Sequence, residues 1–240
     1  MSDMKLDVLA FAAHCDDIEI TSGGLLIKLV DMGYKVGACD LTAGEMGTKG
    51  SKEDRLNESQ CAAKVMGLSA RENLELPDAQ LEFKRDYYLK MAEVIRKYRP
   101  HMVILPHWEQ RHPDHRICSL LGQDACYFSG LKKLELSGEP HRPHKILFAT
   151  YYRTTSTPTF YIDISEQFER KIEAVRCYKS QFDNTPESKQ IFHPGTDVFD
   201  YIKTRDHNQG LTIRAEYAEA YIQKEPMQID DPMGLKVRSV

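Results

Sequence analysis

Apolar runs of strand length alternate along the chain with segments in which apolar residues recur at helical spacing. This alternation is typical of βαβ units, which build a mostly parallel sheet with helices on both faces. We therefore predict an α/β fold, a Rossmann-like three-layer sandwich with right-handed crossovers. The predicted strands are 7–13, 35–41, 72–76, 101–106, 146–152 and 159–164, and the predicted helices are 24–32, 52–66, 85–98 and 114–128.

The pattern becomes less regular in the last quarter of the chain. A further helix is predicted over 165–182, and residues 183–210 show no clear period. The 240 residues have the length of one large domain rather than two complete ones. We expect a single domain, in which about 1–164 form the Rossmann-like core and about 165–240 form a smaller C-terminal lobe.

The composition narrows the class of partner. Lys and Arg number 32 and Asp and Glu number 36, a net charge of −4 that is evenly spread, so neither nucleic acid nor an anionic membrane is expected. No apolar run approaches the roughly 20 residues that span a bilayer, and the N-terminus lacks the basic region and cleavage site of a signal peptide. We expect a cytoplasmic protein whose six cysteines, none in a C-x-x-C pair, are reduced.

Two clusters of histidine and aspartate follow predicted strands. The sequence HCDD at 14–17 comes directly after the first strand, and HPDH at 112–115 follows the fourth. Both should lie at one edge of the sheet, because ligands bind beyond the carboxyl ends of parallel strands. His14, Asp17 and His115 would supply two imidazoles and one carboxylate and leave a position for water, as in a catalytic divalent-metal site. The alternative is ordinary polar residues that cap a strand and a helix, and the presence of two clusters favours the site.

The two clusters resemble the motifs of the LmbE-like (PIG-L) N-acetylglucosamine deacetylases, His-Pro-Asp-Asp and a later His-Pro-Asp-His. Further segments resemble the bacillithiol-biosynthesis branch of that family, and the match covers most of residues 5–222. These segments are LTAGEMGT at 41–48, 55–58, LPD at 76–78, QR at 110–111, 158–165, SQF at 180–182 and YAEAY at 217–221. The resemblance implies a hydrolase that removes the N-acetyl group of an N-acetylglucosaminyl substrate, N-acetylglucosaminyl malate in that branch, by a metal-activated water.

The resemblance also implies the metal ligands and the base. His14, Asp17 and His115 match the zinc ligands, and Fe²⁺ or another divalent metal is the alternative to Zn²⁺. Asp16 matches the general base, because a carboxylate beside the ligands can take a proton from a water whose pKa the metal has lowered. It further implies a homo-oligomer, with hexamers built from trimers among the relatives.

Other family positions imply contacts to the substrate. His112 matches the residue that, as an imidazolium, stabilises the oxyanion or protonates the leaving amine, and Asp114 would fix a histidine ring or act as a helix N-terminal carboxylate. Arg55 and Arg111 match residues that line the pocket, where their guanidinium groups suit the carboxylates of a malyl group, and Glu45 could bind sugar hydroxyls. For these three residues a solvated surface charge is the alternative.

Two departures from the family pattern stand out. Cys15 replaces the proline of the first motif, and a thiol at this position could be a fourth ligand, a nucleophile or, as we expect, neither. Residues 183–210 do not align with the family, so the tyrosine that polarises the substrate carbonyl in some members has only Tyr201 and His193 as candidates.

Rival functions belong to other classes. A nucleotide-binding Rossmann-like module would need a glycine-rich loop after the first strand, where this chain has acidic residues and only an isolated Gly23-Gly24 pair further on. A metal-binding scaffold without activity would not need Asp16. Within the deacetylase class, the alternative substrates are mycothiol-like precursors, thiol conjugates and chitooligosaccharides.

Overall fold

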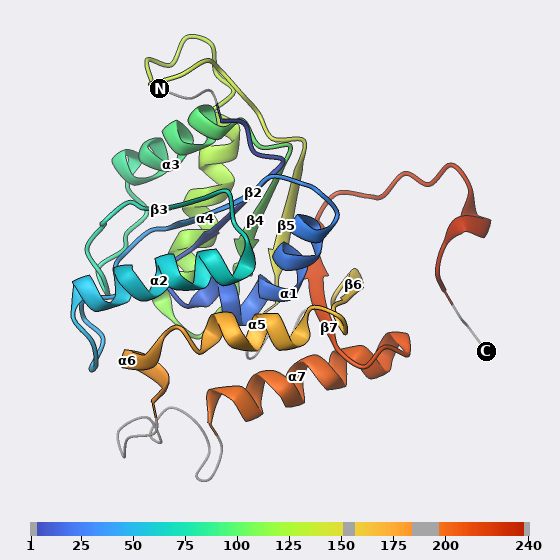
Figure 1. The fold of residues 1–240 in the computed structure, drawn as a ribbon. Coiled ribbons are helices and arrows are strands. Elements are labelled where there is room, and N and C mark those ends of the chain that lie inside the picture. Colours follow the sequence, from blue (N-terminus) through green and yellow to red (C-terminus); the bar gives the residue numbers. More distant parts are fainter. Residues whose placement is uncertain (1–3, 151–156, 184–196, 238–240) are drawn as a thin grey trace.

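A seven-stranded sheet with helices on both faces occupies the centre of the computed structural model, which describes residues 4–150, 157–183 and 197–237 (Figure 1). In sheet order the strands are β3 (Ala70–Asn73), β2 (Val36–Asp40), β1 (Val8–Ala12), β4 (Met102–Pro106), β5 (Lys145–Ala149), β7 (Ala218–Ile222) and β6 (Phe160–Asp163). Strands β1 to β5 are parallel, and β7 is antiparallel to both β5 and β6. The predicted α/β fold with a mostly parallel sheet is therefore confirmed.

Seven α-helices connect and cover these strands in the described part of the chain. They are α1 (Asp17–Asp31), α2 (Lys52–Met66), α3 (Arg85–Tyr98), α4 (Pro113–Phe128), α5 (Phe168–Val175), α6 (Lys179–Phe182) and α7 (Val198–Ile213), and a 3₁₀ turn follows at η2 (Pro232–Gly234). None of the helices in the described ranges has the length and apolar character needed to cross a membrane.

The alternation of side chains along each strand produces two separate core layers. Leu9 and Phe11 of β1 point to the face covered by α3 and α4, and Val8 and Ala10 point to the face covered by α1, α2 and α5. A third apolar cluster lies between α5 and α7 and includes Ile164 at the end of β6. Because both faces of the central strands are covered, those strands are apolar at consecutive positions.

Several elements match the predicted bounds, and α1 does not. Helices α2 and α3 begin and end at the predicted residues, but α1 begins at Asp17 rather than at residue 24. Its first half buries polar residues, Glu19 and Ser22, and so lacks the apolar periodicity that identifies a helix. The glycine at its centre is required by packing, because a Cβ on Gly24 would lie 2.6 Å from Ile164.

The C-terminal quarter differs most from the prediction. Helix α7 includes residues 198–210 of the segment that showed no clear period. The period is hard to detect because the buried positions of this helix, which recur every four residues, include a carboxylate and a glycine: Val198, Ile202, Asp206 and Gly210. The predicted helix over 165–182 is divided into α5 and α6, and β3 begins and ends a few residues before the predicted strand. Strand β5 ends at Ala149, and residues 151–152 of its predicted range lie outside the described residues.

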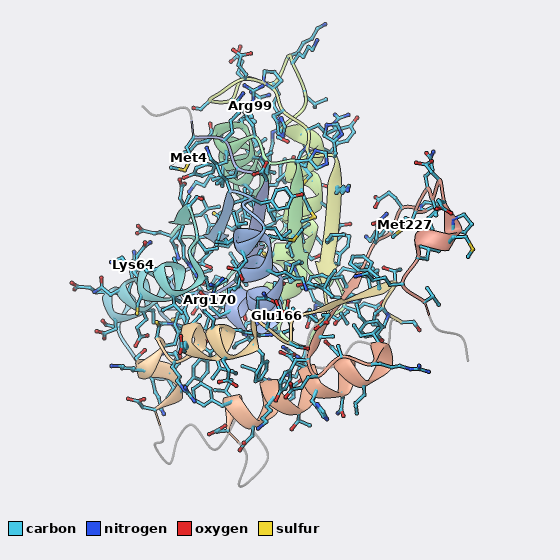
Figure 2. All side chains as sticks on the ribbon, turned by 45° about the vertical axis from the view of Figure 1, so that its right-hand side comes forward. Met4, Lys64, Arg99, Glu166, Arg170 and Met227 are labelled. Atoms are coloured by element: carbon cyan, nitrogen blue, oxygen red, sulfur yellow. The ribbon has the colours of Figure 1, made fainter. Side chains whose placement is uncertain are left out.

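The expected division near residue 164 stays a prediction, and the structure adds one fact about it. Strand β7 comes from the C-terminal quarter and lies in the main sheet between β5 and β6 (Figure 1). Beyond β7, the segment that contains Met227 extends away from the helices and the sheet (Figure 2).

A buried ionic network connects β7 to α1, α5 and α7. Lys171 is fully buried, and its Nζ donates to Asp206 Oδ2 at 2.6 Å and to Glu219 Oε1 at 2.7 Å. Glu219 also accepts the backbone N–H groups of Gly24 and Leu25 at 2.8 Å each, and the hydroxyl of Tyr221 at 2.9 Å. Four donors thus converge on one carboxylate, which makes Glu219 the residue that joins β7 to the middle of α1.

We expect the substitution Glu219→Gln to lower the free energy of unfolding by about 3 kcal/mol, because an amide NH₂ would face donors and Lys171 would lose a charged partner. Chemical denaturation followed by circular dichroism measures this change. Glu216→Gln, at an exposed position of the same segment, is the matched control and should change stability by less than about 0.5 kcal/mol. Equal stability of the two variants would contradict a central role for this carboxylate.

Candidate metal centre

The three predicted ligands meet at the carboxyl end of β1. His14 lies in the loop that follows this strand, Asp17 begins α1, and His115 lies in the first turn of α4. Asp17 Oδ2 is 3.1 Å from both His14 Nδ1 and His115 Nε2, and the two nitrogens are 3.2 Å apart. One oxygen and two nitrogens therefore form a nearly equilateral triangle.

The size of this triangle fits a divalent cation. Ligands at the roughly 2.0–2.1 Å typical of zinc–nitrogen and zinc–oxygen bonds are separated by about 3.3 Å in a tetrahedral site. Two imidazoles and one carboxylate suit Zn²⁺ and also Fe²⁺. In the described chain, two further groups of donor atoms lie within 4.8 Å of one another, His14 with His112 and His115, and His14 with Asp78 and Asp114.

The local charge also suits a cation. Burial alone would lower the pKa of His14, but hydrogen bonds to Asp114, Asp17 and Asp78 raise it well above its usual value. Burial alone would raise the pKa of Asp17, but the charge and hydrogen bond of His115 and the hydrogen bond of His14 lower it well below its usual value. A field that favours protonated imidazole also favours a metal ion in the same place.

Two buried carboxylates lie on the other side of the His14 ring. His14 Nε2 is 3.1 Å from Asp78 Oδ1 and 3.6 Å from Asp114 Oδ2. The Asp114 carboxylate also accepts the Ala79 N–H at 2.8 Å, and Asp78 accepts the Met46 N–H at 2.9 Å. Such carboxylates fix the ring orientation of a metal-binding histidine. Asp114, in α4, was expected to fix a histidine ring, and the ring that it approaches is that of His14 in the loop after β1.

Asp78 is a residue of the site for which the sequence had suggested no role. Burial alone would raise its pKa, but the hydrogen bond and charge of His14 lower it to about 2. The sequence feature that could have indicated Asp78 is Leu-Pro-Asp at 76–78, which follows the third strand and therefore lies at the same edge of the sheet. Nothing in that sequence indicates which way the carboxylate points.

His112 lies at the start of α4 as its N-cap. Its Nδ1 accepts the backbone N–H of Asp114 at 3.2 Å, which leaves the proton of the neutral ring on Nε2. Burial lowers the pKa of His112, and the neighbouring rings of His14 and His115 lower it further. The geometry thus favours a neutral ring that donates through Nε2, whereas the family resemblance implies an imidazolium.

The buried guanidinium group of Arg55 forms an ion pair with Asp16. Asp16 Oδ1 is 3.5 Å from Arg55 Nη2, and Arg55 Nη1 donates to the carbonyl of Gly44 at 2.8 Å. Gly44 has a φ of +70°, and a Cβ at this position would collide with the guanidinium. Arg55 is only 5% exposed, and its two terminal nitrogens already have partners within the chain. Its predicted contact with a substrate stays a prediction.

The other two predicted substrate residues are exposed. Glu45 Oε1 accepts the backbone N–H of Asp78 at 2.9 Å, so this side chain connects the loop after β2 to the loop after β3. Arg111 lies in the loop that precedes α4, immediately before His112. Both therefore lie at the edge of the sheet that carries the candidate ligands.

Cys15 contributes its carbonyl group rather than its thiol to the site. Its sulfur is fully buried, 3.5 Å from Asn73 Nδ2 and 3.7 Å from the carbonyl of Thr42, and burial raises the pKa of the thiol well above its usual value. The Cys15 carbonyl accepts hydrogen bonds from Arg71 and from the hydroxyl of Tyr178. The neutral thiol faces Asn73 and Thr42, a position that suits neither a nucleophile nor a metal ligand.

Of the two candidates for a residue that polarises the substrate carbonyl, only Tyr201 lies within the described residues. Tyr201 lies in α7 and packs against the apolar cluster between α5 and α7. His193 lies outside the described residues.

The part of the chain that matches a known protein family includes both histidine clusters. Residues 9–126 match the family described as PIG-L, GlcNAc-PI de-N-acetylase. The diacetylchitobiose deacetylase of Thermococcus kodakarensis is 35% identical over 196 residues, 75% of this chain and 72% of that protein. The 4-oxalmesaconate hydratase of Pseudomonas putida is 24% identical over 205 residues, 75% of this chain and 76% of that protein. The conserved protein TT1542 from Thermus thermophilus has a solved structure with a TM-score of 0.85, 33% identity and coverage of 96% of this chain and 99% of its own.

We expect His14→Ala to weaken the binding of one Zn²⁺ per chain by more than about 100-fold. Loss of a residue that only supports a ligand costs up to about 100-fold, and this substitution removes a ligand itself. Titration of metal-free protein against a chromophoric chelator measures the affinity. His101→Ala is the control, since His101 is exposed and precedes β4 at the opposite edge of the sheet. Unchanged affinity in the His14 variant would exclude this residue as a ligand.

Proposed function

The chain belongs to the PIG-L family, and on that premise we propose that it is a metal-dependent hydrolase that removes the N-acetyl group from an N-acetylglucosaminyl substrate. The observation that carries this proposal is the position of Asp16, which adjoins the ligand Asp17 in the chain but is held by Arg55 outside the triangle of donor atoms. A site that only binds metal has no need of a carboxylate that lies beside the ligands and is not itself a ligand. The activity named for the Thermococcus relative supports the same reaction.

The proposed reaction adds water to the amide carbonyl and releases acetate and a free amine. When bound to His14, Asp17 and His115, a divalent cation would make water acidic enough to lose a proton near neutral pH and would polarise the carbonyl. Asp16 accepts that proton and returns it to the nitrogen of the leaving amine. The contact with Arg55 fixes the direction of the Asp16 carboxylate during both transfers.

His112 stabilises the negative charge that develops on the carbonyl oxygen. Its Nδ1 is engaged with the backbone N–H of Asp114, so Nε2–H is the group that can donate to the oxyanion. Asp78 and Asp114 act on the reaction through His14, because they hold its ring with Nδ1 toward Asp17. The fixed orientation of these groups lowers the cost of reorganisation when charge develops.

For the substrate we propose N-acetylglucosaminyl malate, as in bacillithiol biosynthesis. The proposal is supported by the sequence segments that resemble that branch and by the exposed Arg111 at the same edge, which suits a carboxylate. A short N-acetylated chitooligosaccharide is the second candidate, because the Thermococcus relative is named a diacetylchitobiose deacetylase. The two candidates share the acetamido group and differ in the charge of the neighbouring group.

The test is acetate release from a panel of substrates by metal-free protein to which Zn²⁺ or Fe²⁺ is added back. The panel contains N-acetylglucosaminyl malate, its uncharged methyl glycoside counterpart and N,N'-diacetylchitobiose. We expect metal-dependent release, fastest with the malate conjugate. A protein that binds metal, releases no acetate and instead hydrates 4-oxalmesaconate would overturn the proposed reaction in favour of the hydratase activity of the Pseudomonas relative.

We expect Asp16→Asn to lower turnover by about 100-fold or more while Zn²⁺ affinity changes little, because the amide keeps the size of the side chain but cannot accept the proton. Steady-state acetate release and chelator competition give the two quantities on one preparation. Asp86→Asn, at an exposed position in the first turn of α3, is the control and should retain full turnover. An Asp16 variant as active as that control would remove Asp16 as the base.

A further inference from the structure

Two cysteines from distant parts of the chain lie side by side, away from the candidate metal centre. Cys61 lies in α2 and is exposed, and Cys177 lies in the short turn between α5 and α6 and is half-buried. Their Sγ atoms are 2.6 Å apart, although 116 residues separate them in the sequence. Helix α2 packs on α5, so the fold itself brings the two thiols together (Figure 1).

This pair differs from the other cysteines of the described chain. Cys15, Cys39, Cys118 and Cys126 are all buried, so Cys61 and Cys177 are the thiols that a reagent in water can reach. A disulfide bond is about 2.05 Å long, so a movement of roughly half an ångström would allow the pair to close.

We propose that Cys61 and Cys177 form a reversible disulfide in the presence of a low-molecular-weight disulfide. In the first step the Cys61 thiolate attacks one sulfur of the reagent, a bond to Cys61 Sγ forms, and one thiolate leaves. In the second step Cys177 loses its proton to solvent and attacks Cys61 Sγ, which expels the second thiolate. Two protein thiols are oxidised, and one small disulfide is reduced to two thiols.

The surroundings of the two sulfurs assign the order of these steps. Burial raises the pKa of Cys177 to about 12, and its hydrogen bond with Cys61 contributes in the same direction. Cys177 is therefore the weaker attacking group toward an external reagent. Cys61 is exposed and makes the first contact, after which Cys177 is already beside the mixed disulfide.

The crosslink would join two elements that support the loop at 14–17. Helix α2 carries Arg55, which contacts Asp16, and Tyr178 follows Cys177 and donates to the Cys15 carbonyl. Ser180 also bonds to Glu58 of α2, through its N–H and its hydroxyl at 2.7 Å each. The disulfide would thus reinforce a contact that the reduced chain already makes.

The experiment compares full-length protein treated with oxidised glutathione and the same protein after dithiothreitol. We expect oxidation to remove two hydrogens, to yield one peptide pair containing residues 61 and 177, and to raise Tm by about 5–10 °C, because a bond that closes so long a loop restricts the unfolded chain. Dithiothreitol should reverse all three changes. Mass spectrometry and thermal unfolding provide the readouts.

Matched variants separate this pair from other thiols. Cys61→Ser and Cys177→Ser should each abolish the crosslinked peptide and the Tm shift, and Cys126→Ala, which removes a buried cysteine, should retain both. A stable glutathione adduct on Cys61, a crosslink between two chains, or an unchanged Tm in the oxidised wild type would each overturn the proposal. None of these readouts depends on catalytic activity, so the result is independent of the proposed function.

Discussion

The carbonyl group of Cys15 is the point on which the candidate site depends, because it fixes the loop that carries His14, Asp16 and Asp17. Arg71 and Tyr178 both donate to it, and Arg71 is held in turn by the buried carboxylates of Glu19 and Asp40. The carbonyl oxygen thus links the loop after β1 to β3 and to the turn before α6, and Arg71 extends this network to β2 and α1. Buried charged groups of this kind are costly unless every partner is present, so the network also specifies a single arrangement of the loop.

Around this fixed loop, the remaining groups arrive from the ends of neighbouring parallel strands. The loop after β2 supplies Gly44 and Glu45, the loop after β3 supplies Asp78, and the loop after β4 leads to His112 and His115. These loops also bind one another, as Glu45 accepts the Asp78 N–H and Asp78 accepts the Met46 N–H. The topology therefore brings residues from four segments to one edge, and the hydrogen bonds between the loops set their distances.

The sequence was most informative where one physical requirement acts alone. Apolar runs identified the central strands, and the two histidine motifs identified the triangle at His14, Asp17 and His115, because strand ends and motif spacing are local properties. The roles of Arg55 and Asp78 could not be obtained in this way, since each is defined by a partner in another loop, Asp16 for the first and His14 for the second. The same reason applies to α7, whose buried positions include Asp206, the partner of Lys171.

The position of β7 has a consequence for how the chain is made. Strand β6 pairs only with β7 among the described strands, and β5 keeps an open edge until β7 arrives. Glu219, which completes the environment of Lys171 and of the middle of α1, also arrives with β7. During synthesis, residues 1–210 would therefore leave the ribosome with the β5 edge unpaired and with Lys171 lacking one of its two counterions, so the segment that contains β7 decides when folding can finish.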